Sequence, residues 1–191
     1  MNAESSADPV IELTGTPGSI VDLCYAEHLT DGRVDLLKPG MSQYFDRILL
    51  GDKPLRHRIA WPKCLQFLQI DLRSGDATVR FVGMEVSSYP VQRKGNFHSN
   101  DLVLDNAWKI GEHTLTLCMD DNFMDTPWRE RGSWLGDTIP QTRANYRIFG
   151  DTKLVRRFLL LHGLGQMPDG ALCGKYPARR TSHVHTWSLT Y

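Results

Sequence analysis

The sequence has no excess of charge of either sign and no long apolar run. Lysine plus arginine and aspartate plus glutamate each number 22, so the formal net charge is zero. A neutral chain exerts no broad electrostatic attraction on phosphate backbones or on anionic lipid. No window approaches the roughly 20 apolar residues that span a bilayer. We therefore expect neither a nucleic-acid partner nor a membrane partner.

Cysteine is scarce and has no recognisable spacing. The cysteines are Cys24, Cys64, Cys118 and Cys173. They form no Cys-x-x-Cys pair, and no histidine stands at zinc-finger distance, so we expect free thiols in a reducing compartment. The N-terminus has no basic region followed by an apolar run, so no signal peptide is predicted. The expectation is a soluble, cytoplasmic protein with no bound metal and no cofactor.

The chain divides into two segments of different periodicity. From Val10 to about Tyr89, runs of β-branched, aromatic and leucine residues are separated by turn sequences such as TDGR and RSGD. We predict antiparallel β structure, part of a β-sandwich, over residues 1–96. Beyond it the apolar spacing approaches 3.6 residues, so residues 97–191 are predicted to be helical.

Three helices are predicted in the second segment. The first spans about 102–118 and begins after the capping candidates Ser99, Asn100 and Asp101. The second starts near Pro140 and ends at Gly150. Asp151 is expected to cap the third. The apolar face of the first helix comprises Leu104, Trp108, Leu115 and Cys118. That of the third comprises Leu154, Val155, Phe158, Leu159 and Leu161.

A long segment, residues 119–137 (the charged loop), separates the first two predicted helices. Its stretch DTPWRERGSWLGD contains three carboxylates, two arginines and two tryptophans. Helix connections usually have two to eight residues, and longer ordered ones tend to be functional. Sugar sites combine planar hydrogen-bonding groups, an apolar ring face and a carboxyl pair. Groups of the first two kinds are supplied by Asp125, Arg129, Trp134 and Asp137.

Glu130 is the candidate proton donor in this loop, and it stands between Arg129 and Arg131. If the strip is extended, alternation points both arginines away from the face that Glu130 occupies. The alternative is a structural loop in which the arginines neutralise the acids and the tryptophans fill gaps. Residue types alone leave both interpretations open.

The same stretch resembles the motif Asp-Cys-Pro-x-Arg-Glu-Arg-x-x-Trp-x-x-Asp of the bacterial α-L-rhamnosidases, which have a six-hairpin (α/α)6 barrel. GNFHSNDLVLDNAWKIGEHTL resembles the first barrel helix of that family, and MPDGALCGKYPARRTSHVHTWSLTY resembles the segment entering the next hairpin. CYAEHLTDGRV is similar to a stretch of the preceding β-sandwich. One departure is Thr126, where the motif has cysteine, and we expect it to have little effect.

The resemblance implies a partial β-sandwich domain over 1–96, followed over 97–191 by the first hairpins of an incomplete (α/α)6 barrel. It implies that Glu130 is the general acid of an inverting α-L-rhamnosidase. It also implies that the rhamnose subsite is lined by Asp125, Arg129, Trp134 and Asp137. The family's general base lies on a later barrel helix, beyond this sequence. The chain is thus expected to be an inactive fragment whose partners are a rhamnoside and the rest of the barrel or a second copy.

Two other functions remain open from the sequence. One is a truncated carbohydrate-binding protein that retains the sugar-binding residues but does not hydrolyse a glycoside. The other is a six-hairpin glycosidase with a different specificity, acting on another deoxyhexose or on a uronide.

Overall fold

The computed structural model describes residues 3–35, 44–179 and 184–189. It divides into two compact units, Met1–Ser87 and Ser88–Tyr191. Each unit has its own set of buried apolar side chains.

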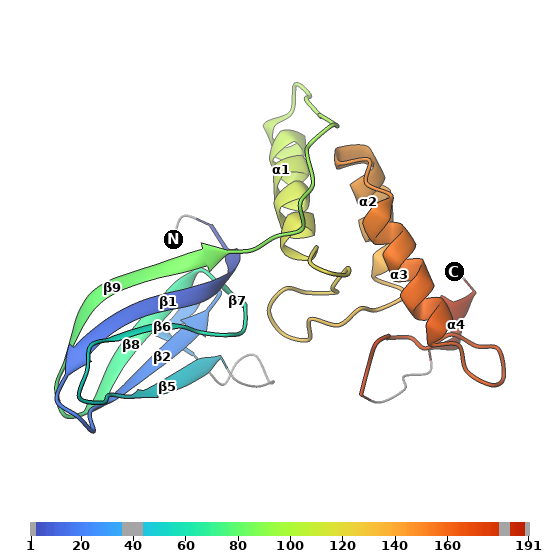
Figure 1. Cartoon of the computed structure of the whole chain (residues 1–191). Coiled ribbons are helices and arrows are strands. Elements are labelled where there is room, and N and C mark those ends of the chain that lie inside the picture. The colour runs from blue at the N-terminus through green and yellow to red at the C-terminus, as the bar shows by residue number, and fades with distance from the viewer. Residues whose placement is uncertain (1–2, 36–43, 180–183, 190–191) are drawn as a thin grey trace. The chain divides into compact units, whose positions relative to one another are not determined.

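The first unit is built of antiparallel strands (Figure 1). The strands are β1 (Ser5–Gly15), β2 (Ile20–Ala26), β3 (Leu29–Thr30), β4 (Arg33–Val34), β5 (Phe45–Leu49), β6 (Leu55–Arg58), β7 (Lys63–Leu65), β8 (Phe67–Ser74) and β9 (Ala77–Val86). In one sheet β1 pairs with β6, β7 and β9, and in a second β2 lies between β5 and β8. A two-stranded sheet, β3 with β4, completes the described pairings. The predicted antiparallel β structure is confirmed.

Burial along the two central strands follows from their positions. Strand β1 alternates between buried and half-buried residues, with Ala7, Ile11 and Leu13 buried, so one face of its sheet is turned to the core. Strand β2 is buried almost throughout and is flanked on both edges by neighbouring strands.

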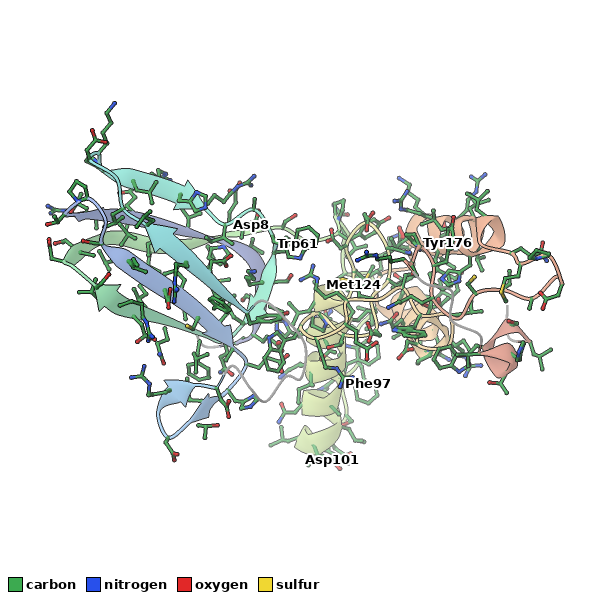
Figure 2. All side chains as sticks on the ribbon, turned by 90° about the horizontal axis from the view of Figure 1, so that it is seen from below. Asp8, Trp61, Phe97, Asp101, Met124 and Tyr176 are labelled. Carbon is green, nitrogen blue, oxygen red and sulfur yellow. The ribbon has the colours of Figure 1, made fainter. Side chains whose placement is uncertain are left out.

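The second unit contains the helices α1 (Leu102–Leu117), α2 (Thr138–Ile148), α3 (Lys153–Leu164) and α4 (His185–Ser188). The three longer helices agree with the predicted ones. At the start of α1 (Figure 2), the Asp101 carboxylate accepts the Val103 N–H at 2.8 Å, which satisfies one of the unpaired amides of the first turn. The Asp151 carboxylate accepts the Leu154 N–H at 2.9 Å in the same way. Gly150 has a φ of 62° just beyond α2, a conformation that glycine adopts at little cost.

The helices and the charged loop share one core. Its buried members are Leu115, Met119, Phe123, Leu135, Ile148, Phe149, Leu154, Val155, Phe158 and Leu172. Two positions predicted to lie on apolar faces are exposed: Leu104 is 50% exposed and Leu159 is 41% exposed. The core gathers at the C-terminal end of α1, so the turn that carries Leu104 extends past the side chains that could cover it.

Residues 88–96, which the sequence pattern grouped with the β segment, make contacts inside the second unit. The N–H groups of Lys94 and Gly95 both donate to the Ile148 carbonyl at 2.8 Å. A Cβ on Gly95 would lie only 1.8 Å from the Arg147 carbonyl oxygen, so this approach requires glycine. The connection is therefore held to the end of α2.

The sequence lacks a long apolar run and has few cysteines, and the structure bears on both features. Among the described residues, no helix is long and apolar enough to cross a membrane. The four cysteines are all buried and are not joined in disulfides, as predicted.

Candidate functional site

The charged loop connects α1 to α2 and is closed by one of its own acids. The Asp125 N–H donates to the Gly132 carbonyl at 2.9 Å, and the Gly132 N–H returns a bond to the Asp125 carboxylate at 2.7 Å. Between them the chain turns, and Arg131 adopts a φ of 50°. The strip is therefore not extended throughout, because a left-handed residue turns the backbone within the motif.

Glu130 is held by one donor on each carboxylate oxygen. The Arg129 guanidinium donates to Oε1 at 3.0 Å, and the Trp134 indole N–H donates to Oε2 at 3.1 Å. On an extended strip Arg129 would point away from Glu130, whereas here it contacts that residue. The Arg131 guanidinium donates to the Pro127 carbonyl at 3.2 Å. The turn places Arg129 beside its neighbour, which alternation along a strand would not do.

The ion pair orients Glu130 more than it stabilises the fold. The Arg129 side chain is 54% exposed and that of Glu130 is 25% exposed. A pair with this exposure contributes about 0–1 kcal/mol to folding. The two bonds nevertheless fix the carboxylate plane, and each oxygen keeps a second lone pair on which a proton can be held.

Two further carboxylates, Asp125 and Asp137, belong to the charged loop. Burial raises the pKa of the Asp125 carboxyl, and the negative charges of Glu130 and Asp137 act in the same direction. The N–H groups of Gly132 and Thr126 oppose the rise, since they bind the ionised form. Asp137 is the N-cap residue of α2 but makes no side-chain capping bond, so its carboxylate is not committed to the helix. The loop thus concentrates negative charge around one point.

Trp134 is packed by residues from later in the chain. Its ring meets the edge of the Trp187 ring at a centroid distance of 5.6 Å and an interplanar angle of 84°. The Lys175 ammonium lies 4.9 Å from the Trp134 ring centroid. A Cβ on Gly136 would stand 2.4 Å from the Trp187 ring, so glycine there leaves room for that ring. The indole is held between the charged loop and the segment after α3.

A buried network of polar side chains connects the charged loop to α3. The Asn122 amide donates to the Ser133 hydroxyl at 2.6 Å, and that hydroxyl lies 3.5 Å from His162 Nε2. His162 is fully buried on α3. Burial lowers its pKa, while backbone groups of Cys173 and Ser133 act in the opposite direction. The neutral imidazole is therefore the favoured form at neutral pH.

Sequence reasoning did not single out Ser133, His162 or Lys175. A signal for His162 was present, because it follows Phe158 by four residues and so lies on the buried face of α3. For Lys175 the local sequence contains no signal, since its partner stands on another segment.

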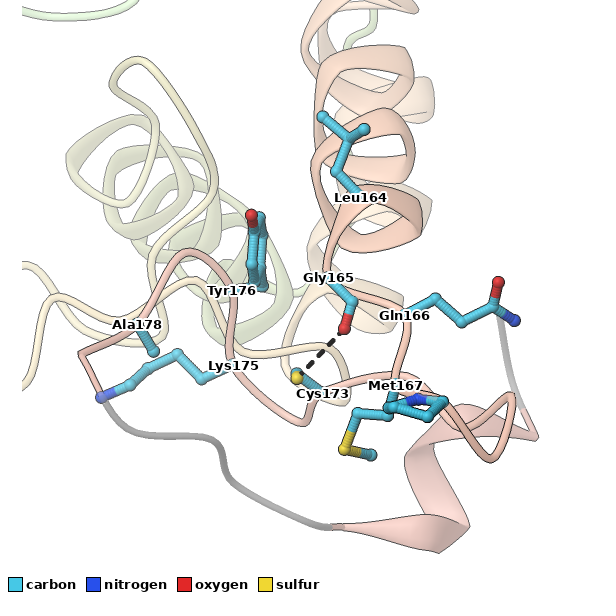
Figure 3. A pocket seen from close by; sticks show the side chains of 9 residues that line it. Leu164, Gly165, Gln166, Met167, Cys173, Lys175, Tyr176 and Ala178 are labelled. Atoms are coloured by element: carbon cyan, nitrogen blue, oxygen red, sulfur yellow. Dashed lines mark hydrogen bonds between the residues drawn. The ribbon is translucent and has the colours of Figure 1, made fainter.

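A pocket of about 260 Å³ opens between the end of α3 and the loop that follows it (Figure 3). Its walls include Leu164, Met167 and Tyr176, and Lys175 also lines it. The Cys173 thiol donates to the Gly165 carbonyl at 3.2 Å, which joins the two sides of the pocket.

In the described part of the chain, one group brings metal-ligand atoms together: those of Glu4, Glu27 and Cys64 all lie within 4.8 Å of one another. The Cys64 thiol donates to the Glu4 carboxylate at 2.9 Å. Burial, a hydrogen bond with Glu4 and the negative charge of Glu4 together raise the pKa of Glu27 to about 8. A proton shared by the two carboxyl groups accounts for this cluster, which belongs to the first unit.

A loop that combines clustered carboxylates, a guanidinium and an indole ring is typical of a carbohydrate site. The comparison with protein families agrees with that class. Residues 92–191 match the bacterial alpha-L-rhamnosidase 6 hairpin glycosidase domain. This is just over half of the chain, and the chain belongs to this family. The comparison with curated proteins gave no match.

Solved structures of rhamnosidases resemble the chain over nearly its whole length. A GH78 family rhamnosidase of Bacillus sp. GL1 is 25% identical with a TM-score of 0.84, and the similarity covers 98% of this chain and 20% of that one. A rhamnosidase from Klebsiella oxytoca with rhamnose bound is 18% identical with a TM-score of 0.81, covering 98% of this chain and 40% of that one. The α-L-rhamnosidase from Dictyoglumus thermophilum gives 17% identity, a TM-score of 0.83, and coverage of 98% and 22%. The chain thus spans between a fifth and two-fifths of these relatives.

Proposed function

We propose that this chain is part of an α-L-rhamnosidase that releases terminal α-L-rhamnose with inversion, and that Glu130 is its general acid. The observation that carries the proposal is the pair of donors on Glu130, from Arg129 at 3.0 Å and from Trp134 at 3.1 Å. A general acid must protonate the departing glycosidic oxygen and then remain as a carboxylate. The two donors stabilise that carboxylate as it forms and keep it aimed in one direction.

The rhamnose subsite is proposed to consist of Asp125, Arg129, Trp134 and Asp137. Carboxylates and a guanidinium can accept from and donate to sugar hydroxyls, and an indole offers an apolar surface to the C–H side of the ring. Negative charge at Asp125 and Asp137 also lies close to where an oxocarbenium-like transition state would carry positive charge. The binding of rhamnose by the Klebsiella oxytoca enzyme supports this choice of sugar.

The general base is proposed to come from a segment outside this chain. Inversion requires a second carboxyl group about 6.5–9.5 Å from the acid, with a water between them. In this proposal the second unit forms the first hairpins of an (α/α)6 barrel, the first unit is the end of a β-sandwich, and later barrel helices carry the base. The greater length of the similar structures supports it.

The first experiment measures hydrolysis of p-nitrophenyl α-L-rhamnoside by the purified 191-residue chain, without and with sodium azide as an external nucleophile. Little cleavage is expected without azide, because no base activates water. Azide can attack the anomeric carbon directly, so it is expected to restore turnover and to give the inverted rhamnosyl azide.

The matched variants separate the acid from general effects on folding. Glu130→Gln should abolish the azide-dependent reaction on a rhamnoside with a poor leaving group, because protonation is then indispensable. Glu85→Gln changes an exposed glutamate of the first unit and should have no effect. Cleavage that survives Glu130→Gln would refute the assignment of the acid, and robust hydrolysis without azide would refute the external base.

A carbohydrate-binding protein without turnover is the second candidate, favoured by the fact that contacts within the charged loop already hold Glu130 in place. In that case the chain would bind rhamnose, as measured by titration of tryptophan fluorescence, but would not form the azide. A fucoside and a glucuronide tested in parallel would reveal a six-hairpin glycosidase of another specificity.

A further inference from the structure

Lys175 approaches the proposed acid through Trp134. The backbones of these two residues form an isolated antiparallel bridge, although 41 positions separate them in the sequence. The bridge is extended on both sides, because the Leu135 N–H donates to the Gly174 carbonyl at 2.8 Å and the Tyr176 N–H donates to the Ser133 carbonyl at 3.2 Å. Lys175 is thereby fixed at its backbone beside the indole.

The side chain of Lys175 is directed onto Trp134 by the shape of its surroundings. Its ammonium lies 4.9 Å from the indole centroid. A Cβ on Gly132 would stand 2.6 Å from Lys175 Cδ and 2.8 Å from Trp134 Nε1. The absence of a side chain at Gly132 therefore lets the lysine stem and the indole N–H occupy the same small space. Among the described residues, Lys175 makes no ion pair with a carboxylate, and its ammonium lies over the Trp134 ring.

A cation over an indole is attracted by the negative face of the ring and draws electron density from it. The N–H of the same indole then becomes a better donor, and this N–H is the one that binds Glu130 Oε2. The edge contact with Trp187 restrains the ring from another side. Two restraints on the ring leave the N–H with one direction, toward Glu130.

We propose that Lys175 is a positioning residue for Glu130, which it orients through the indole of Trp134. The proposal rests on the proposed function of Glu130 as general acid. It assigns a role to a residue outside the charged loop. The loop after α3 then helps to orient the carboxyl group that donates the proton.

The test follows the indole N–H of Trp134 in ¹H–¹⁵N spectra of the 191-residue chain, with the resonance assigned by its loss in Trp134→Phe. In Lys175→Met the resonance is expected to move upfield, toward its position in Glu130→Gln, as the bond to Glu130 weakens. Its exchange with solvent should accelerate about two- to fivefold, the Boltzmann factor of a cation–π contact at an exposed site. Lys175→Arg keeps the charge over the ring and should restore the wild-type signal.

A merely structural role would disturb the spectrum differently. The indole signals of Trp61, Trp108 and Trp128 should stay in place in Lys175→Met, and Lys153→Met, which removes an exposed lysine from the start of α3, should leave all five indoles unchanged. If Lys175→Met does not fold, Lys175→Gln provides the same comparison. A Trp134 resonance and exchange rate identical to wild type would overturn the proposal, as would a failure of Lys175→Arg to restore them.

The outcome is separable from that of the proposed function, because the resonance reports these contacts whether or not a rhamnoside is cleaved. A clear effect of Lys175→Met with no azide-dependent cleavage would overturn the proposed function, and with it the catalytic meaning of the contact. Azide-dependent cleavage with no effect of Lys175→Met on Trp134 would overturn the role of Lys175 alone.

Discussion

The substitution Gly132→Ala probes the geometry of the proposed acid with a single methyl group. The new Cβ would lie 2.8 Å from Trp134 Nε1 and 2.6 Å from Lys175 Cδ. The lysine stem is flexible and can move, whereas the indole is held by Trp187. To reach ordinary contact at 3.4 Å, the indole nitrogen must retreat by about 0.6 Å.

That movement is large compared with the tolerance of a hydrogen bond. The bond from Trp134 to Glu130 is 3.1 Å long and would lengthen to as much as about 3.7 Å, beyond the range in which it counts as a hydrogen bond. A bond to a charged acceptor contributes about 1.5–3 kcal/mol, and the low end applies because Glu130 is partly exposed. If the full effect falls on the transition state, the rate should fall about tenfold.

The assay combines the Trp134 indole resonance with the azide-dependent cleavage of a rhamnoside that has a poor leaving group. Gly111→Ala is the matched control, because a Cβ there meets nothing within 4 Å and the residue lies within α1. It should leave both readouts unchanged and stabilise the helix by about 0.5–1 kcal/mol. Retention of the wild-type indole resonance and rate in Gly132→Ala would show that the indole is not confined as we argue.

Other consequences can be measured by urea unfolding. The raised pKa of Glu27 means that its protonated form stabilises the first unit; this contribution is complete below the ordinary glutamate value of 4.5, declines above it and is lost as pH rises through about 8. Glu27→Gln should therefore flatten the fall in stability between about pH 5 and about pH 9, and an unchanged profile would count against the buried carboxyl pair. Ser133→Ala removes the hydroxyl between Asn122 and His162 and should lower the free energy of unfolding by about 1–3 kcal/mol, because a buried amide loses its partner. A decrease no larger than that of an exposed serine variant such as Ser74→Ala would contradict this. Asp101→Ala should destabilise α1 by about 1 kcal/mol through loss of the hydrogen bond from the Val103 N–H. Asn100→Ala is the control, and equal effects of the two substitutions would argue against the cap.

Local sequence was sufficient for much of the architecture. The helices followed from periods near 3.6 and from capping residues such as Asp101 and Asp151, which act on amides only two or three positions away. The antiparallel strands followed from runs of β-branched, aromatic and leucine residues separated by turn sequences. The motif between Asp125 and Asp137 indicated the family, because it lies within one continuous loop.

What the sequence could not supply are the burial of individual side chains and the turns of the backbone within the charged loop. Periodicity predicted Leu104 as a core residue, yet it is 50% exposed, since burial depends on which neighbour covers a turn. On an extended strip, alternation would point Arg129 away from Glu130, but the backbone turns at Arg131, which is left-handed, and the two side chains meet. No local pattern records such a reversal.

The sequence by itself determined the elements of this protein, its family, and the residues from which an acid and a sugar subsite can be drawn, because these depend on neighbours along the chain. Only the tertiary structure decided that Trp134 and Arg129 both bind Glu130 and that Lys175 lies over the indole. The physical reason is that packing and hydrogen bonding act through space. A lysine 41 positions away becomes a neighbour only after two segments pair.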